Sequence, residues 1–305
     1  MKLQYYKGKV PNFGDDLNDW MWRRILPEGI LDEDEKELFV GIGSILNSHL
    51  PKEPKKYVFG SGFGGYGRPP EVTDEKWDIR FVRGPDTANL INAPAEKAVC
   101  DSAILLREVR DLPEPATNIG TALIPHFESL ENGYWEQVAE KAGFTLIDPR
   151  GDVETILSQI RGADLVITEA MHGAIVADAL RIPWIGLLPV NPAHHMKWHD
   201  WSKSLNIKLD AQFMPPTSLL EWYINKTKGL KYYDGRAKRY NESKWAKPLN
   251  DFLIKRSALR LKRLKNITPQ LSDESVIVDK TRQAKDIVDI FVEEQIAKRK
   301  EKANG

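Results

Sequence analysis

Cysteine is nearly absent from this sequence, since Cys100 is the only one in 305 residues. A single thiol forms neither an internal disulfide nor a cysteine-rich metal cluster, so we expect a protein of a reducing compartment. Long apolar runs are also lacking, because charged residues interrupt even the most apolar stretch, residues 164–187. The N-terminal segment resembles neither a signal peptide nor a membrane span, and the sequence predicts a soluble, cytoplasmic protein.

Net charge is absent as well, because 44 Lys and Arg residues balance 44 Asp and Glu residues. A chain without an excess of positive charge has no long-range field to attract nucleic acid, so we expect no nucleic-acid partner. Repeats of solenoid period and low-complexity tracts are missing too. What is present is 41% hydrophobic residues, including 9 Trp, 9 Tyr and 10 Phe, which is enough for a sizeable core.

Short β-rich runs alternate with helical runs along the first two thirds of the chain, a pattern typical of α/β proteins with parallel sheets. A proline-rich break at 110–118 interrupts this alternation, which then resumes. We therefore predict a Rossmann-like N-terminal domain, a second Rossmann-like domain, and a basic helical region that packs on them or is partly mobile. Their bounds are 1–112, 113–215 and 216–305. Two such domains in tandem face a cleft, and ligands bind beyond the carboxyl ends of parallel strands.

Residues 164–187 predict a buried strand, a turn, a nearly all-apolar helix and a second strand. The turn places His172 at the carboxyl end of the strand and the amino end of the helix. Free backbone N–H groups, the helix dipole and a side chain that carries a proton meet there, which favours an anion. The alternative interpretation is a histidine that caps or packs locally.

The glycine-rich stretch 60–65 matches the GxGxxG pattern of dinucleotide-binding sites. Two prolines follow instead of a helix, so we expect a loop at a strand end that allows close approach of a ligand, with Gly62 in it. Arg83 occupies the corresponding strand end two segments later, just before a helix that starts at Pro85. A guanidinium there can clamp a phosphate or carboxylate, or else form a surface ion pair with Asp86.

The segment 191–205 combines histidines, Lys197, Asp200 and two tryptophans. We interpret it as a loop that rims the cleft, with Lys197 supplying positive charge and the tryptophans a flat surface for a sugar. His194, His199 and Asp200 lack the spacing of a known helical metal site, so no metal is expected.

A polar segment follows the first predicted strand and contains Asn12, Gly14, Asp15 and Asp16. Acidic residues are ordinary in the first turn of a helix, where they cap free N–H groups. One carboxylate can cap this helix while the other reaches outward to a ligand.

The region from Arg236 to Lys265 is dense in Lys and Arg. A solvated face is the simpler interpretation of such a region. The alternative is contact with anionic lipid headgroups at the inner face of a membrane.

Several segments together resemble the polysaccharide pyruvyltransferase family, closest to its bacterial exopolysaccharide (succinoglycan-type) ketal-pyruvyltransferases. The resemblance covers roughly residues 1 to 205 and is carried by "NFGDDLN", "GIGSIL", "VFGSGFG", "RGPDTA", "DSAILL", "IPHFES", "TEAMHGAIVADALRIPW" and "KWHDW". It implies a two-domain architecture similar to that of GT-B glycosyltransferases, with the acceptor side in 1–112 and the donor side in 113–215. It also implies transfer of the pyruvyl group of phosphoenolpyruvate onto two hydroxyls of a sugar, with release of phosphate.

Many relatives carry an Arg-Leu-His turn where this chain has Ala170, Met171 and His172. Any phosphate contact that this arginine makes in the relatives must be made by another residue in this chain. We expect Arg83 or Lys197 to make it. Under this hypothesis His172 is the catalytic acid and Asp15 or Asp16 accepts the hydroxyl proton. The substrate-binding candidates are Arg83, Lys197, Gly173, Asn12, Gly14, Gly62, His126, Glu169 and Asp200.

The partners expected from this resemblance are phosphoenolpyruvate as co-substrate, without a further cofactor, and a saccharide acceptor that can be a lipid-linked oligosaccharide. Two competing interpretations stay open. One is a GT-B glycosyltransferase with a nucleotide-sugar donor, and the other is a sugar-binding or scaffold protein without catalytic activity.

Overall fold

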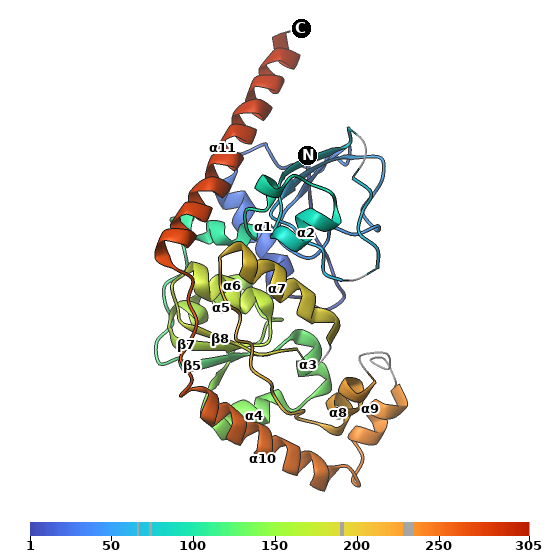
Figure 1. Ribbon diagram of the computed structural model, residues 1–305, viewed down its shortest axis with the longest axis vertical. Helices are drawn as coiled ribbons and strands as arrows, with labels where there is room; N and C mark the ends of the chain where they lie inside the picture. Colours follow the sequence, from blue (N-terminus) through green and yellow to red (C-terminus); the bar gives the residue numbers. More distant parts are fainter. Residues whose placement is uncertain (66, 73–74, 190–191, 228–234, 305) are drawn as a thin grey trace.

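The first half of the chain forms a four-stranded parallel sheet (Figure 1). The computed structural model describes all residues except 66, 73–74, 190–191, 228–234 and 305. The sheet has the order β1-β2-β3-β4, with strands β1 (Lys2–Gln4), β2 (Glu37–Val40), β3 (Lys55–Phe59) and β4 (Trp77–Phe81). Strands β2 and β3 are buried beyond their first residue, as expected for apolar runs covered on both faces.

The second half forms another four-stranded parallel sheet, in the order β6-β5-β7-β8. Its strands are β5 (Gly120–Ile124), β6 (Thr145–Leu146), β7 (Ala163–Thr168) and β8 (Trp184–Gly186). The α/β class and the two parallel sheets are confirmed. The sheets lie on opposite sides of the predicted boundary at 112, whereas the GT-B-like arrangement and the cleft stay predictions.

Helices connect successive strands throughout the second half, whereas in the first half α1 joins β1 to β2 and the connections from β2 to β3 and from β3 to β4 contain no helix within the described residues. Pro85 occupies the first turn of α2, as expected from its fixed φ and missing N–H. The helical elements of the first half are α1 (Phe13–Ile25), α2 (Pro85–Leu90), η1 (Ala95–Lys97) and η2 (Ser102–Glu108). Those of the second half are α3 (Phe127–Asn132), α4 (Trp135–Ala142), α5 (Val153–Arg161), α6 (Met171–Ala179), η3 (Pro192–His194) and α7 (His195–Ser204).

Helix α6 connects β7 to β8 and is almost entirely buried. All of its residues except His172 are buried, because its apolar sequence packs between the second sheet and its neighbours. Strand β7 ends at Thr168 and α6 begins at Met171. The predicted position of His172, between a buried strand and a buried helix, is therefore confirmed.

The segment 191–205 differs from its prediction, because its described part is helical and forms η3 and α7. Trp198 and Trp201 are 0% and 1% exposed, and their rings lie 6.3 Å and 5.4 Å from that of Trp184. The expectation that they offer a flat surface to a sugar was therefore wrong. Their spacing of three residues puts both on one face of a helix, which here faces the core.

The C-terminal region consists of helices that return across the molecule (Figure 1). They are α8 (Leu219–Lys226), α9 (Gly235–Asn241), α10 (Lys247–Leu264) and α11 (Glu274–Asn304). Helix α10 packs on α4 of the second half, whereas α11 runs back along the first half. The ring of Phe291 in α11 lies 5.0 Å from Tyr57 and 4.9 Å from Phe59. This region therefore completes the cores of both halves.

Candidate functional site

His172 lies in the first turn of α6, and its side chain is 14% exposed. The ring packs directly over the backbone of Gly14 at the start of α1. A Cβ atom at Gly14 would lie 1.9 Å from Nδ1 of His172, so a side chain there would displace the imidazole. Glycine at position 14 thus allows the first half to approach the histidine of the second half.

The Nε2 atom of His172 lies 3.8 Å from Oδ2 of Asp101. Both atoms are buried and neither has a hydrogen-bond partner within the described residues. The other oxygen of Asp101 accepts a hydrogen bond from the backbone N–H of Ala103 and caps η2. Sequence reasoning missed this carboxylate as a site residue. Its signal was the aspartate that precedes the apolar run "SAILL" and opens a helical turn.

The two adjacent carboxylates of α1 have different surroundings. Oδ2 of Asp16 accepts a hydrogen bond of 3.1 Å from the backbone N–H of Asn12 and so closes the first turn. Oδ2 of Asp15 accepts one of 2.6 Å from the side-chain amide of Asn12. Burial raises the pKa of Asp15, and the charges of His172 and Lys197 oppose this shift. Asp15 is therefore the carboxylate that faces the histidine.

Arg83 is fully buried and its guanidinium is held by three groups. It donates to Oδ2 of Asp200 at 3.0 Å, to Oγ of Ser44 at 2.8 Å and to the carbonyl of Phe63 at 2.7 Å. A Cβ atom at Gly62 would lie 2.3 Å from its Cζ atom, so this glycine makes room for the guanidinium. The alternative of a surface ion pair with Asp86 was wrong.

Asp86 instead pairs with Lys203 of α7, at 2.7 Å. Asp200 of the same helix is 1% exposed and accepts hydrogen bonds from the backbone N–H groups of Asp86 and Thr87 and from the Thr87 hydroxyl. Its carboxylate thus joins α7 to the start of α2 while it pairs with Arg83. Asp200 was expected to contact substrate; because its oxygens are engaged inside the protein, the structure gives it the role of holding Arg83.

Lys197 of α7 lies near several of the charged groups described so far. Burial and the neighbouring charge of Arg83 lower its pKa to about 8, while Asp15, Glu128 and Glu169 oppose the shift. One ammonium group therefore lies near a cation that follows β4, Arg83, and near carboxylates from α1, from α3 and from the connection between β7 and α6. Gly173 follows His172 in α6 and packs closely on the Thr168 hydroxyl at the end of β7.

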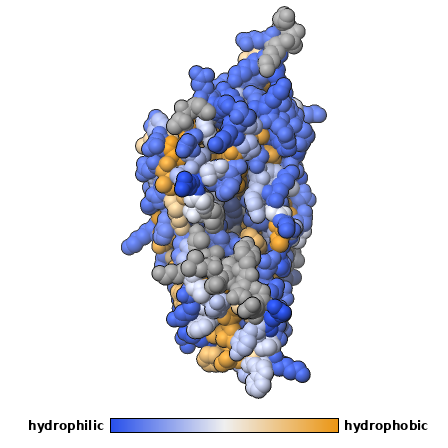
Figure 2. All heavy atoms as spheres, turned by 90° about the vertical axis from the view of Figure 1, so that its right-hand side faces the viewer, coloured by the Kyte–Doolittle hydropathy of each residue, from blue (hydrophilic) through white to orange (hydrophobic). Residues whose placement is uncertain are grey.

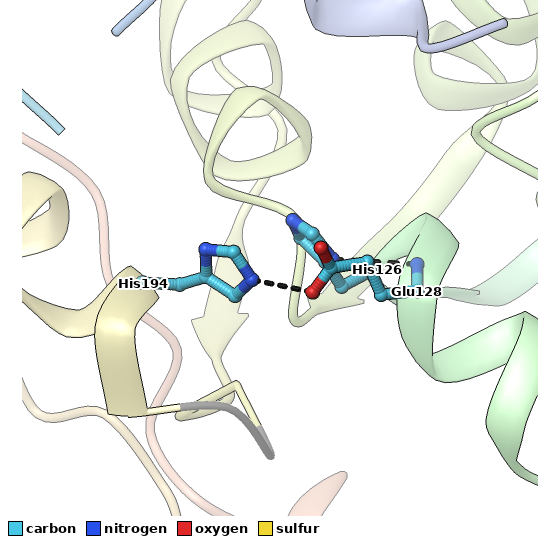
Figure 3. Close-up of side chains that lie close together, drawn as sticks. All are labelled: His126, Glu128 and His194. Atoms are coloured by element: carbon cyan, nitrogen blue, oxygen red, sulfur yellow. Dashed lines mark hydrogen bonds and ion pairs between the residues drawn. The ribbon is translucent and has the colours of Figure 1, made fainter. Parts of the chain in front are cut away.

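His126, Glu128 and His194 form a second cluster beside Lys197 (Figure 3). Nε2 of His194 lies 2.6 Å from Oε2 of Glu128, and the two imidazole rings stack at 4.3 Å with an interplanar angle of 29°. Burial is the main cause that lowers the pKa of both histidines, well below the usual value for His126. Glu169 accepts a hydrogen bond from the backbone N–H of His126 at 2.9 Å.

These three side chains offer metal-ligand atoms within 4.8 Å of one another. A metal ion lies close to the plane of each imidazole that binds it. Because the rings of His126 and His194 stack nearly face to face, their lone pairs do not converge on one point. The geometry fits a hydrogen-bonded cluster better than a metal centre, and the absence of a metal stays a prediction. His199, weighed earlier for such a site, is exposed.

The structure thus brings together His172, Asp15, Lys197 and Arg83, with Glu169 and His126 next to them. Gly14 and Gly62 belong to the site as positions of close approach. Three further predicted residues hold members of the site by hydrogen bonds. Asn12 holds Asp15, and Asp16 closes the same helical turn. Asp200 holds Arg83. Sequence reasoning missed Asp101, which lies outside the predicted strand ends. It also missed Glu128, which follows the same strand end as His126 but looks like an ordinary acidic residue in the first turn of a helix.

Comparison with known proteins identifies the family of this chain. Residues 3–189 match the family model described as "Polysaccharide pyruvyl transferase". The chain is also 36% identical over 235 residues to the succinoglycan biosynthesis protein ExoV of Rhizobium meliloti (strain 1021). The aligned region covers 76% of this chain and 73% of the relative. No solved structure gives a significant match. The chain therefore belongs to the polysaccharide pyruvyl transferase family, and the protein is an enzyme of that family.

Proposed function

We propose that this enzyme transfers the pyruvyl group of phosphoenolpyruvate to two hydroxyls of a sugar in an exopolysaccharide repeat unit. The products are a cyclic pyruvate ketal and inorganic phosphate. The observation that carries the proposal is the position of His172, which lies at the amino end of buried α6 and faces Asp15 and Asp101. The name of the relative, a succinoglycan biosynthesis protein, supports a polysaccharide acceptor.

Phosphoenolpyruvate carries a carboxylate and a phosphate, so its site needs more than one cation. A cation about 4 Å from a unit negative charge contributes about 4 kcal/mol at an effective dielectric constant near 20, before desolvation is subtracted. Lys197 supplies a positive charge at the centre of the group, and Arg83 adds the field of a second cation. The N–H groups of the first turn of α6, near Gly173, favour an anion in the same place.

His172 delivers a proton to the methylene carbon of phosphoenolpyruvate, which becomes a methyl group. The central carbon then carries oxocarbenium character and forms a bond with the oxygen of the first sugar hydroxyl, whose proton passes to Asp15. Next the bond between the central carbon and the phosphate oxygen breaks, and phosphate leaves with the electron pair. The second hydroxyl attacks the same carbon and passes its proton to His172, which is neutral after the first step, so that the ketal closes and the acid is restored.

Asp15 is the better acceptor of the two neighbouring carboxylates. Burial raises its pKa, which makes it a stronger base than an exposed aspartate. Asp16 is engaged with the backbone of Asn12 and acts as a cap. Asp101 lies behind His172, where its carboxylate holds the ring in place.

The acceptor in this proposal is a lipid-linked oligosaccharide at the inner face of a membrane. The basic C-terminal region provides the peripheral contact with that membrane. Within the described residues no helix has the length and apolar character needed to cross a bilayer.

The test is incubation of the full chain with phosphoenolpyruvate and an oligosaccharide repeat unit, followed by mass spectrometry of the saccharide. We expect a pyruvyl adduct and phosphate release that depends on the acceptor. Thermal unfolding with phosphoenolpyruvate and with a panel of nucleotide sugars identifies the donor, because the ligand that binds the native state raises the melting temperature. Stabilisation by a nucleotide sugar alone would favour a glycosyltransferase and contradict the proposal.

A further inference from the structure

Large apolar side chains are exposed around helix α10, at the end of the molecule opposite the tip of α11 (Figure 1). Figure 2 shows hydrophobic residues on the surface of this lower end. Trp245 is 86% exposed, and Phe252 is 62% exposed. Further exposed members of the same region are Phe213, Leu249 and Leu259.

These side chains do not belong to the core that holds α10. The inward face of the helix packs on α4 through Ile254, Ala258 and Leu261, which are at most 4% exposed. Phe252 and Leu259 stand seven residues apart, or about two helical turns, on a different face. Helix α10 thus has one apolar face inside the protein and a second one outside.

The outer face borders a groove of about 570 Å³. Phe213, Phe252 and Leu259 give the groove apolar walls, and Lys255, Arg256 and Arg263 add positive charge along it. These three cations form no ion pair with any residue in the described part of the chain. The groove therefore combines unpaired positive charge with exposed apolar area.

Positive charge is concentrated in the sequence around this groove. Residues 238–265 contain ten Lys and Arg residues and two acidic residues, a net charge of +8 in a chain whose total is zero. The predicted basic region begins at Arg236, whose side chain lies outside the described residues. The surface is therefore complementary in charge to an anionic partner.

We propose that this surface, which we name the α10 face, binds an anionic lipid bilayer. It consists of Phe213, Trp245, Leu249, Phe252 and Leu259 together with the cations of α10. Exposed Trp, Phe and Leu beside Lys and Arg are suited to the boundary between headgroups and acyl chains. A nucleic acid would use the charge, but would leave the apolar side chains in water. The inference rests on the proposed function only in that a lipid-linked acceptor would be held at such a surface.

The test is co-sedimentation of the full chain with vesicles of phosphatidylcholine alone and of phosphatidylcholine mixed with phosphatidylglycerol. We expect partitioning onto the anionic vesicles and little onto the neutral ones, with a decrease at high salt. Replacing Lys255, Arg256 and Arg263 with Gln should weaken the partitioning by about 100-fold, since each cation near an anionic surface contributes a factor of about five. Phe252→Ser combined with Leu259→Ser should weaken it as well, because apolar insertion is lost.

The matched control replaces three exposed lysines of the first half, Lys9, Lys36 and Lys52, with Gln. This variant has the same net charge as the α10 variant, and it should bind anionic vesicles about as well as the unmodified chain. Equal loss in both variants would show attraction by net charge alone and would overturn the proposal. So would equal binding to neutral vesicles, or no binding to either kind.

Size-exclusion chromatography without lipid tests whether a second copy of the chain occupies the α10 face. A dimer that dissociates on the Phe252→Ser and Leu259→Ser changes would assign the α10 face to self-association and overturn the lipid proposal. Vesicle binding requires neither phosphoenolpyruvate nor an acceptor, whereas transfer to a water-soluble oligosaccharide requires no lipid. Failure of one measurement therefore leaves the other interpretable.

Discussion

The imidazole Nε2 of His172 lies 3.8 Å from the carboxylate Oδ2 of Asp101, and both atoms lack a hydrogen-bond partner among the described residues. The histidine comes from α6 of the second half, whereas the aspartate caps η2 at the end of the first half. A buried carboxylate that faces an imidazole nitrogen restricts the orientation of the ring. Asp101 is thus placed to hold the catalytic acid that we propose, without touching the substrate.

Replacing Asp101 with Asn should lower kcat about 10- to 100-fold and leave KM for phosphoenolpyruvate nearly unchanged. The amide keeps an oxygen for the N–H of Ala103 but loses the charge that faces His172. Steady-state kinetics together with thermal unfolding check this expectation. Asp152→Asn is the matched control, because Asp152 caps α5 in the same way without a histidine beside it. If Asp101→Asn lowers kcat and the melting temperature together, Asp101 acts only as a structural cap of η2.

Replacing His172 with Gln should lower turnover at least about 100-fold, the usual contribution of a positioned general acid. Glutamine fills similar space but cannot deliver a proton from a cationic ring. Calorimetric titration with phosphoenolpyruvate should give an affinity close to that of the unmodified enzyme. Unchanged turnover would reject the role of His172 as the acid.

Replacing Gly14 with Ala should cost about 100-fold in kcat, because a displacement of a catalytic group by about 1 Å has effects of that size. The added methyl group would occupy a point 1.9 Å from Nδ1 of His172, so the ring must move. Gly151→Ala serves as the control, since its nearest neighbour is a backbone oxygen at 3.2 Å and no histidine lies near. If both variants retain full activity, the ring position does not matter for turnover.

Phosphoenolpyruvate affinity should be highest below pH 8 and should fall as the pH rises through that value. The pKa of Lys197 is lowered to about 8, so the side chain is positive below this pH and loses its charge above it. Binding isotherms over this pH range measure the change. Lys197→Arg should remove the decline, because a guanidinium stays charged throughout the range. Lys203 on the same helix is exposed and pairs with half-buried Asp86, so Lys203→Arg should leave the decline in place. A flat profile for the unmodified enzyme would exclude Lys197 from the anion site.

The prediction for residues 191–205 shows where sequence reasoning fails. The polar and aromatic composition of this segment suggested a loop, but α7 buries Trp198 and Trp201 against Trp184. The helical spacing of the tryptophans was available in the sequence, yet the surface they cover was not. Burial depends on how α7 folds back onto β8, the strand that precedes it, and the local pattern does not specify that packing.

Elsewhere local chemistry was sufficient. Apolar runs separated by helical patterns identified the α/β class, and the proline at position 85 marked the start of α2. His172 could be placed at the junction of β7 and α6 because strand and helix signals depend on residues only a few positions apart.

The amino-acid sequence by itself determined the alternating elements and the strand end that carries His172, because backbone preference and side-chain periodicity act over short distances. Only the tertiary structure decided which groups face one another. Arg83 could pair with nearby Asp86 or with any distant acid, and packing of α7 against α2 selected Asp200, 117 residues away. Asp101 meets His172 for the same reason, since a contact between two halves depends on how their surfaces fit together.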